Sequence, residues 1–425
     1  MPRPIRILHI TCGLNGGAGL GARRLHQALL ASGSDSWVLC HSTAEDEAVP
    51  QVRIRPALCL ADRIRRLPSA ALHKAGLWKS PRLLAREATK EVRRKYGVTF
   101  YSGLSAFHLD REPIVQNADI VHLHWVGEFL DVPSFFRRVQ KPIVWTLRDE
   151  WPLIGGFHYR TDAPASLPKW IADIDSASRR LKEAAFQAHR RTAFISLSRA
   201  MAEFARSTPI GAQRPVRVIP NPVNGDVFHP GNGRAIRSEF GIPDDAIVIS
   251  FVAQRINDNR KGLADLISAA ASLPHRDITL LCVGNGNPPT DVPPGIRIVC
   301  TGPVSDPARL ASIYSASTLF AAPSKAESFG KTLTEALACG IPAVSYPNDG
   351  AKDIVRESDG VLSSDFSPES FRSALKEALS RSFDSAELRR GALSRFSPEA
   401  VARRHNELYS RLLGEAELEC GLEGR

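Results

Sequence analysis

The chain contains 425 residues, of which 43% are hydrophobic and 24% charged, a balance that is typical of globular proteins and excludes a disordered chain. No run of about 18 apolar residues occurs, which excludes a membrane-spanning helix, and the length favours two domains. The formal net charge is +10, and between Gln51 and Lys95 thirteen Lys or Arg face three Asp or Glu, so the sequence predicts one basic patch.

The N-terminus, MPRPIRILHI, lacks the apolar stretch and the small-residue cleavage site of a signal peptide. We therefore expect a cytoplasmic protein. The seven cysteines include no C-x-x-C pair, which argues against a zinc or redox motif and favours buried free thiols in a reducing compartment.

Short apolar runs alternate with stretches of helical periodicity along the chain, which predicts parallel α/β units. The runs are apolar almost throughout, as expected for strands covered on both faces. The predicted strands are Arg6–Ile10, Ser36–Cys40, Asp119–His124, Pro142–Leu147 and Ala193–Ser198 in the first half, and Ala246–Ala253, Ile278–Gly284, Ile296–Gly302, Ser317–Ser324 and Pro342–Pro347 in the second.

A segment rich in Pro, Gly and Asn, VRVIPNPVNGDVFHPGNGR, follows a predicted strand near the middle of the chain. This composition is typical of a linker between domains. We place the boundary at Pro220, with one domain at 1–220 and a second at 221–396.

The last helix is predicted from its first residues. Ser397 and Pro398 are of the types preferred at the N-cap and at the first helical position. They predict an amphipathic helix at 397–413 that returns to the N-terminal domain, followed by a frayed tail at 414–425.

Glycines separate the first predicted strand from the first helix. Gly16 and Gly17 lie where backbone N–H groups can hold a phosphate. The spacing does not fit the dinucleotide fingerprint G-x-G-x-x-G, and the second strand ends in Cys40 and His41 instead of an acidic residue that would hold a ribose. These two features argue against a nicotinamide-dependent dehydrogenase.

Two histidines alternate in the run DIVHLHW and therefore lie on one side of a strand. His124, at the end of the run, is expected to line a cleft, whereas His122 is expected to be a hydrogen-bonded core histidine. Asp173 and Asp175 form a D-x-D in a predicted helical stretch, where we do not expect a metal.

Two cations follow the first strand of the second half. Arg255 and Lys261 lie where the carboxyl end of a strand meets the crevice of an open α/β sheet, the usual ligand site, and two cations there suit a pyrophosphate. The alternative is a pair of solvated loop cations. Gly284, in VGNG, ends the next strand and on its own indicates only a tight turn.

Two glutamates flank a predicted helix start in the segment AAPSKAESFGKTLTEALACGIPAV. Glu327 precedes the helix and Glu335 lies within it, so the two carboxylates can reach different parts of one ligand. The free N–H groups of Phe329, Gly330 and Lys331 favour an anion at this helix start. The alternative is a pair of solvated glutamates on a surface helix.

The segments PNPVNGDVF, RINDNRKG, VGNG and ESFGKTLTEALACGIPAV resemble, in order and spacing, the large retaining glycosyltransferase family 4 of GT-B fold, over about residues 193–409. The first half looks like the acceptor domain of that family, closest to bacterial enzymes of colanic acid, exopolysaccharide or lipopolysaccharide synthesis. The resemblance implies an α/β protein with two Rossmann-like parallel-sheet domains that face each other across a cleft.

The resemblance also implies roles for the candidates. Glu335 would bind the ribose of the donor, Glu327 would contact the sugar hydroxyls, and His124 would lie near the donor sugar. Arg255 and Lys261 would neutralise the phosphates of the leaving group. The other implied donor-binding residues are Ser328, Phe329, Gly330, Lys331, Gly284, Gly17 and Gly16.

The implied function is transfer of a hexose-type sugar, with retention and without a metal or other cofactor, from a nucleotide-diphosphate sugar to a lipid-linked or polysaccharide acceptor. Front-face attack, with the leaving phosphate helping to deprotonate the acceptor, usually explains retention in this family. Two alternatives stay open: a GT-B protein that binds a nucleotide sugar without transfer, and a nucleotide-sugar epimerase.

Two departures from the family pattern concern the acceptor side and the sugar preference. Relatives usually read T-x-H-D where this chain has TLRD at 146–149, and Arg148 cannot act as a base. It instead suits a more anionic acceptor. After the last predicted strand, Asp353 with Lys352 beside it stands in place of a common glutamate.

The basic segment at 61–95 mixes arginines and lysines with Leu and Trp and predicts one or two short amphipathic helices, broken near Pro68 and Pro81. We expect it to hold the acceptor domain against the anionic inner face of the cell membrane. The alternative is a solvated helix pair packed on the domain. Without interleaved stacking aromatics, nucleic-acid binding is not expected.

Overall fold

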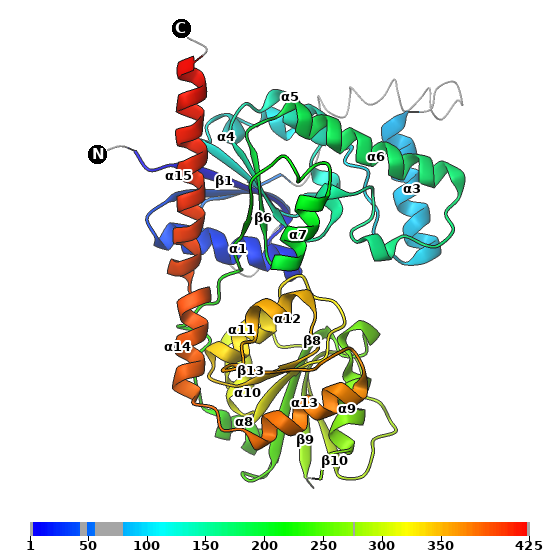
Figure 1. Cartoon of the computed structure of the whole chain (residues 1–425), viewed down its shortest axis with the longest axis vertical. Helices are drawn as coiled ribbons and strands as arrows, with labels where there is room; N and C mark the ends of the chain where they lie inside the picture. Colours follow the sequence, from blue (N-terminus) through cyan, green and yellow to red (C-terminus); the bar gives the residue numbers. More distant parts are fainter. Residues whose placement is uncertain (1–2, 43–48, 56–79, 275–276, 423–425) are drawn as a thin grey trace. The chain divides into compact units, whose positions relative to one another are not determined.

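The computed structural model describes residues 3–42, 49–55, 80–274 and 277–422, with side chains to residue 414. The chain divides into two compact units, Met1–Ile219 with Ala402–Arg425 (unit 1) and Pro220–Val401 (unit 2). Each is an α/β unit built on its own sheet (Figure 1). Among the described helices, none combines the length and the apolar character that a membrane crossing requires.

Unit 1 has a seven-stranded sheet in the order β3-β2-β1-β4-β5-β6-β7. All neighbouring strands in this sheet pair in parallel. The central strands β4, β5 and β6 are buried along their whole length, as continuous apolar runs require. The strands are β1 (Arg6–Gly13), β2 (Asp35–Ser42), β3 (Val52–Ile54), β4 (Ile120–Leu123), β5 (Ile143–Leu147), β6 (Thr192–Ser196) and β7 (Val216–Val218).

Helices cover the sheet of unit 1. They are α1 (Gly16–Ala31), α3 (Pro81–Tyr96), α4 (Pro113–Gln116), α5 (Val132–Arg138), α6 (Lys169–Ala188), α7 (Arg199–Ser207) and α15 (Pro398–Leu422), with 3-10 turns η1 (Leu109–Arg111), η2 (Gly127–Phe129), η3 (Trp151–Leu153) and η4 (Arg160–Asp162). The core is aromatic where α5 and α6 meet the sheet: the ring of Phe136 lies 6.0 Å from that of Trp145 and 4.8 Å from that of Phe186.

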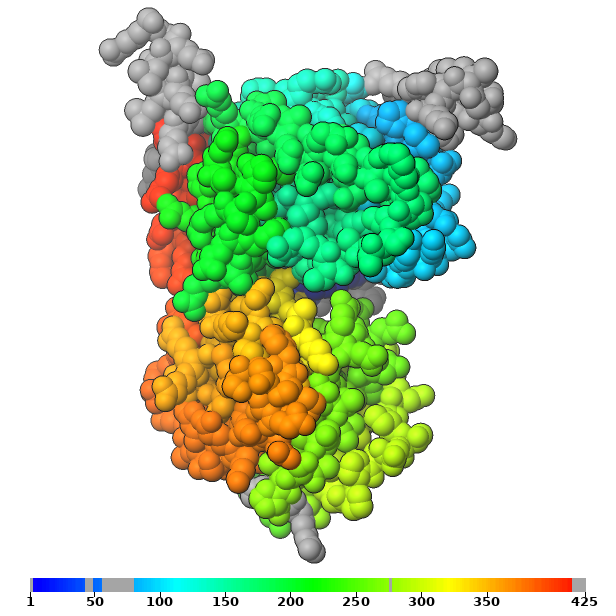
Figure 2. Space-filling view, turned by 45° about the vertical axis from the view of Figure 1, so that its right-hand side comes forward, coloured from blue at the N-terminus to red at the C-terminus, as the bar shows by residue number. Residues whose placement is uncertain are grey.

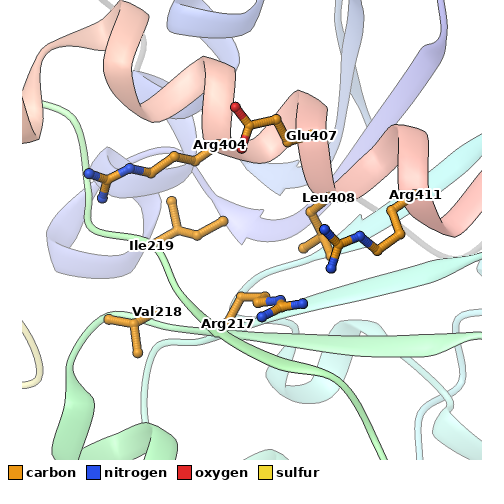
Figure 3. A pocket seen from close by; sticks show the side chains of 7 residues that line it. All are labelled: Arg217, Val218, Ile219, Arg404, Glu407, Leu408 and Arg411. Atoms are coloured by element: carbon orange, nitrogen blue, oxygen red, sulfur yellow. The ribbon is translucent and has the colours of Figure 1, made fainter.

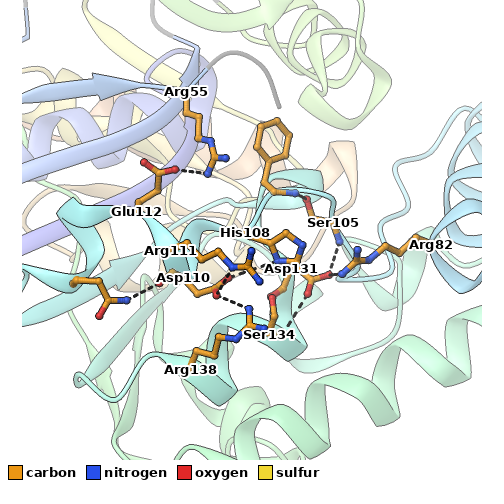
Figure 4. A network of polar contacts seen from close by, with 12 residues as sticks. Arg55, Arg82, Ser105, His108, Asp110, Arg111, Glu112, Asp131, Ser134 and Arg138 are labelled. Carbon is orange, nitrogen blue, oxygen red and sulfur yellow. Dashed lines mark hydrogen bonds and ion pairs between the residues drawn. The ribbon is translucent and has the colours of Figure 1, made fainter. Parts of the chain in front are cut away.

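Two buried aspartates tie the loops before β4 to α5 and to the start of α3 (Figure 4). Asp131 accepts from the backbone N–H groups of Ser105 and Ser134 and pairs with Arg82 at 3.2 Å. Asp110 pairs with Arg138 at 2.7 Å. These contacts fix α3 to unit 1 by its first turn, and Ala85, Ala88 and Val92 bury its apolar face.

Unit 2 has a six-stranded parallel sheet in the order β10-β9-β8-β11-β12-β13. The strands are β8 (Ile247–Arg255), β9 (Ile278–Asn285), β10 (Ile296–Gly302), β11 (Leu319–Ala322), β12 (Ala343–Ser345) and β13 (Gly360–Leu362). The helices are α8 (Gly233–Glu239), α9 (Leu263–Ala271), α10 (Pro307–Ser315), α11 (Lys331–Ala338), α12 (Asp349–Ile354), α13 (Pro368–Ser380) and α14 (Ser385–Phe396), with the turn η5 (Asn259–Lys261). In Figure 2, α6 and α7 (green) lie on the surface of unit 1, and α13 (orange) lies on the surface of unit 2.

Each sheet has one point where the strand order reverses. In unit 1 the chain runs outward from β1 through β2 to β3, and outward the other way from β4 through β5 and β6 to β7. In unit 2 the reversal falls between β8 and β11. Open α/β sheets bind ligands outside the carboxyl ends of the strands at this reversal, so each unit has one favoured place for a site.

All ten predicted strands are present, and three further strands are found that were not predicted: β3, β7 and β13. Each is three residues long, and β3 and β7 read VRI and VRV, so a charged residue interrupts the apolar run. The boundaries at the C-terminus were wrong: the last helix does not end at 413 but continues to Leu422. The residues after Leu413, GEAELECGL, are mostly good helix formers.

The C-terminal helix α15 packs in unit 1. Tyr409 Oη lies 2.6 Å from His122 Nδ1 in β4, and Asn406 Oδ1 accepts from Ser34 Oγ at 3.3 Å. Ser397 caps the helix by accepting from the backbone N–H of Ala400 at 3.2 Å. Of the predicted basic segment, residues 61–79 lie outside the described residues, and 80–95 are almost entirely α3.

Candidate functional site

The strand-order reversal of unit 2 brings a cation and a carboxylate together. Lys261 follows β8 in the turn η5, and Glu327 follows β11 in the loop before α11. The Lys261 ammonium and the Glu327 carboxylate form an ion pair, and both side chains keep more than a quarter of their surface exposed. A ligand can therefore reach both groups at the place that the topology favours.

Hydrogen bonds hold the two loops in position. The backbone N–H of Lys325 donates to the carbonyl of Arg260 at 2.9 Å. Ser324 Oγ donates to Glu327 Oε1 at 3.1 Å, and Asn348 Nδ2 donates to the Ser324 carbonyl at 2.8 Å. The Glu327 carboxylate is thus oriented before any ligand arrives.

Two glycines are required because the loop backbones approach each other closely. A Cβ on Gly262, where φ is +75°, would lie 2.2 Å from the carbonyl oxygen of Pro323. A Cβ on Gly284, where φ is +143°, would lie 1.9 Å from the carbonyl oxygen of Ala253. Gly284 therefore allows the end of β9 to approach the backbone of β8 closely. From its sequence, Gly284 indicated only a tight turn.

Arg255 is the last residue of β8 and pairs in register with Asn285 of β9. Its side chain is exposed, and it makes no ion pair with any residue in the described part of the chain. A cation without a carboxylate partner at this sheet edge is available to an anionic ligand.

The helix α11 starts at the same edge. Gly330 is its N-cap with φ +93°, has no side chain to cap the helix, and no acidic residue follows in the first turn. Phe329 is buried with its ring 6.0 Å from that of Phe396, so only its backbone can face a ligand. Ser328 and Lys331 are half-buried at this helix start. The first N–H groups of α11 thus remain a favourable place for an anion.

Glu335 lies one turn into α11 and is only 4% exposed. Its Oε2 accepts from the hydroxyl of Tyr314 in α10 at 3.3 Å. The structure therefore separates the two glutamates: Glu327 contacts Lys261 in the loop, whereas Glu335 is held in the body of the unit. The solvated-pair alternative does not describe Glu335, because a side chain this buried is not on the surface.

A cavity of about 330 Å³ in unit 1 lies at the end of β1 and is lined by the glycine loop, Ser42 and Trp125. Gly16, with φ +68°, begins α1, and Gly17 would have open space around a Cβ. Gly19 is different, because a Cβ there would lie 2.6 Å from the carbonyl oxygen of Gly13. Gly17, Gly19 and Trp125 line the cavity, so the glycine loop forms one of its walls.

His124 lies at the end of β4, and its side chain is only 1% exposed. Arg148 Nη2 lies 3.2 Å from His124 Nδ1, and His9 Nδ1 lies 2.9 Å from His124 Nε2. Because a guanidinium only donates, His124 accepts at Nδ1 and donates from Nε2. For His124 to contact a sugar, the sugar would have to replace Arg148 or His9 as a hydrogen-bond partner of the imidazole.

Burial keeps this histidine cluster neutral. It lowers the pKa of His9, His122 and His124 well below the ordinary value, and the neighbouring histidines and the Arg148 charge lower it further. Burial also lowers the pKa of Arg148 to about 9, which leaves the guanidinium charged at neutral pH.

One group in the described residues, His9, His122 and His124, has ligand atoms close enough together for a metal ion, within 4.8 Å. His122 uses both ring nitrogens, toward Tyr409 Oη at 2.6 Å and Thr146 Oγ1 at 2.7 Å. His122 is therefore the hydrogen-bonded core histidine that the sequence predicted, and a metal would have to displace these partners beside the Arg148 charge. Asp175, of the D-x-D, accepts instead from the backbone N–H of Gly156 at 2.7 Å.

The sequence did not indicate that two further ionisable residues, Asp149 and Lys182, are buried and interact electrostatically. Asp149 follows β5 in the sequence, and burial raises the pKa of its carboxyl group to about 7. Lys182 of α6 is fully buried, donates to the carbonyl of Gly155 at 2.6 Å, and has its pKa lowered by burial to about 7. Perturbed pairs of this kind are common near functional sites. The sequence could have indicated this through the position of Lys182, which lies on the buried face of α6 with Ile171, Ser178 and Phe186.

Comparison with known proteins identifies the family. The model described as Glycosyltransferase Family 4 matches residues 15–227, half of the chain, and the model described as Glycosyl transferases group 1 matches residues 246–381. A D-inositol 3-phosphate glycosyltransferase of Segniliparus rotundus is 32% identical over 203 residues, which is 44% of this chain and 45% of that protein. The chain spans about half the length of the curated relatives it matches.

Two solved structures share the fold at low identity. Sucrose-phosphate synthase of Thermosynechococcus elongatus is 20% identical with a TM-score of 0.63, covering 97% of this chain and 100% of that one. Anabaena HepE in complex with UDP and glucose is 15% identical with a TM-score of 0.63, covering 96% and 100%. Two Rossmann-like parallel-sheet units and the two family matches lead to one assignment: the chain is a member of glycosyltransferase family 4, with the GT-B α/β fold.

Proposed function

We propose that the chain is a retaining glycosyltransferase that moves a hexose-type sugar from a nucleotide-diphosphate donor to a lipid-linked or polysaccharide acceptor of the cell envelope. The contact of Lys261 with Glu327 at the strand-order reversal of unit 2 carries the proposal. It sets a group suited to phosphate beside a group suited to sugar hydroxyls, and these two chemistries meet at the bond that a transferase breaks.

Lys261 and Arg255 bind the diphosphate in this proposal. As the bond to the sugar breaks, negative charge grows on the leaving phosphate, and cations already in place stabilise it. The N–H groups at the start of α11 add a positive dipole end. With three positive elements supplied by the chain itself, the reaction proceeds without a metal ion.

The glutamates bind the two sugars of the donor. Glu327 gives up its contact with Lys261 in part and accepts from hydroxyls of the transferred sugar. Glu335 accepts from the ribose hydroxyls, with its carboxylate oriented by Tyr314. HepE, whose structure contains UDP and glucose, supports a nucleotide sugar as the ligand class.

Unit 1 receives the acceptor in this proposal. The buried Arg148 supplies a positive charge where relatives usually have a histidine, which favours an acceptor bearing an anionic group. Attack occurs on the face that the leaving group departs from, and a phosphate oxygen of that group takes the proton of the acceptor hydroxyl. The protein acts in the cytoplasm, at the inner face of the membrane.

The direct test measures the release of nucleoside diphosphate when the full chain receives each of several nucleotide sugars with a cell-envelope lipid extract. Release that depends on the extract and is lost in Glu327→Gln supports the proposal. Donor binding, seen as a raised melting temperature, without release from any donor–extract combination would contradict transfer and leave a nucleotide-sugar-binding protein. The anomeric configuration of the product, read by NMR, tests retention.

A further inference from the structure

A second cavity lies in unit 1, and it shares no lining residue with the cavity at the glycine loop. Its volume is about 270 Å³, and it lies between the edge strand β7 and the helix α15. The lining residues are Arg217, Val218, Ile219, Arg404, Glu407, Leu408 and Arg411 (Figure 3). The proposed transfer reaction uses none of these residues.

The cavity is cationic. Three arginines and one glutamate line it, which gives a net charge of +2. On α15 the residues Arg404, Glu407, Leu408 and Arg411 are spaced by three and four positions, so they share one helix face. Arg217 approaches the same space from β7.

No carboxylate in the described residues forms an ion pair with these arginines. Arg217, Arg404 and Arg411 make neither an ion pair nor a side-chain hydrogen bond there. In Figure 3 the guanidinium groups of Arg217 and Arg411 approach the same part of the cavity, and the Glu407 carboxylate points away from them. Like charges that converge in this way repel unless an anion lies between them.

The floor of the cavity is apolar. Ile219 and Leu408 are 4% and 6% exposed and lie beneath the charged rim. An apolar floor lowers the local dielectric and strengthens an interaction with the rim charges. Arginine binds phosphate through two parallel hydrogen bonds, and a phosphate monoester carries about −1.5 to −2 charges at neutral pH, which matches the charge of the cavity.

We propose that this cavity is a binding site for a phosphate monoester, held between Arg217 and Arg411. Ligand pockets usually measure about 300–1,000 Å³, so the cavity suits a phosphate group with a small attachment and not a whole nucleotide sugar. The phosphate belongs either to a soluble metabolite or to the headgroup of an anionic lipid, and the same two arginines bind it in both cases.

The experiment titrates the full chain with inorganic phosphate by calorimetry and, in a second arm, floats it with phosphatidylcholine vesicles that do or do not contain phosphatidic acid. The test variant is the double substitution Arg217→Gln and Arg411→Gln. The control is Arg403→Gln, which removes an exposed arginine from α15 outside the cavity. Lys261→Ala separates this site from the donor site, because it alters only unit 2.

The double variant should lose a phosphate-binding component, or bind phosphatidic acid vesicles about tenfold or more weakly, while Arg403→Gln and Lys261→Ala keep that component. A tenfold loss corresponds to about 1.4 kcal/mol, slightly less than one hydrogen bond to a charged group usually contributes. Loss in the phosphate arm alone identifies a soluble ligand, and loss in the vesicle arm, with or without loss in the phosphate arm, identifies a lipid headgroup. Identical behaviour of wild type and double variant in both arms would overturn the proposal. If the double variant fails to fold, Arg411→Gln alone, at an exposed position, serves instead.

Discussion

Tyr409 and His122 are 287 positions apart in the sequence, yet the tyrosine hydroxyl lies 2.6 Å from Nδ1 of the histidine. Both side chains are fully buried. This bond joins the last helix of the chain to the centre of the unit 1 sheet, beside His9 of β1 and His124 directly after β4. The C-terminal helix is therefore part of the core of unit 1.

Tyr409→Phe should lower the free energy of unfolding by about 1–3 kcal/mol, because it leaves a buried ring nitrogen of His122 without its partner. Urea denaturation followed by circular dichroism measures the change. Asn406→Ala, which removes a longer bond from the same helix to Ser34, is the control and should cost about 0.5–1.5 kcal/mol or less. Equal stabilities of Tyr409→Phe and wild type would show that this bond is not needed.

The stability of unit 1 should fall as the pH drops below 6.5. In the folded chain His9, His122 and His124 have pKa values lowered well below the ordinary 6.5 by burial. The unfolded chain then binds more protons than the folded chain at mildly acidic pH, so unfolding is favoured, by up to about 1.4 kcal/mol per pH unit for each histidine. Above pH 6.5 the histidines are neutral in both states and contribute no slope.

Asp149 acts in the opposite direction, because burial raises its folded pKa from 3.8 to about 7, so that its contribution favours folding at low pH. Urea midpoints measured from neutral to mildly acidic pH give the net slope. His9→Gln should reduce that slope by about one proton, whereas His229→Gln, at an exposed position of unit 2, should leave it unchanged. A flat profile in the wild type would contradict the neutral buried cluster.

Lys261→Ala should lower kcat/KM for the donor by about 100- to 1,000-fold, the usual effect of removing one group that stabilises developing charge. The Glu327 carboxylate also loses the cation that it contacts. Lys261→Arg keeps a positive charge at this position and should therefore recover part of the activity. Lys376→Ala, on α13 of the same unit, is the matched control. The readout is nucleoside diphosphate release, and a wild-type rate in Lys261→Ala would exclude the proposed phosphate contact.

Glu335→Ala should abolish turnover or lower it severely while the fold survives. The variant loses the acceptor for the donor ribose in the proposed complex, where hydrogen bonds to a charged group contribute about 1.5–3 kcal/mol each. Its unfolding free energy should fall by only about 1–3 kcal/mol, for the lost partner of Tyr314. Glu369→Ala, at the exposed start of α13, controls for the loss of a charge. Normal turnover, or an intact glycan product in cells that carry only Glu335→Ala, would refute the role.

The proximity of Lys261 and Glu327 in unit 2 could be predicted from the sequence, because both lie in loops that follow strands. Lys261 and Glu327 each come after an apolar run, and a parallel sheet brings the carboxyl ends of such runs to one edge. Gly262, Gly284 and Gly330 mark the turns. The deep burial of Glu335 was not readable, because spacing along a helix gives the face of a residue but not what packs against that face.

The polar core of unit 1 could not be predicted in the same way. His9 sits inside the first strand and Lys182 inside a long helix, and their partners come from other elements. His9 meets His124 across 115 positions, and Lys182 meets the carbonyl of Gly155 across 27. Local patterns do not encode such pairings; they arise only when the sheet order is known.

The helix α3 is the described part of the basic segment. Ala88 and Val92 of its apolar stripe pack with Phe100, Phe157 and Ile171 within unit 1, and Ala85 is also buried, so the stripe is not available for insertion into a bilayer. Arg86 and Arg93 are exposed. A membrane contact made by α3 must therefore be electrostatic, and salt should reverse it.

Substituting Arg86→Gln together with Arg93→Gln should weaken binding to anionic vesicles by about 10- to 30-fold, because each cation near such a surface contributes about 1 kcal/mol. Flotation with and without phosphatidylserine, at low and high salt, measures the loss. The control pair Arg234→Gln and Arg372→Gln removes the same charge from exposed positions of unit 2 and should bind like wild type. Equal flotation with anionic and neutral vesicles would end the membrane hypothesis, and equal losses in both variants would assign binding to net charge instead of to α3.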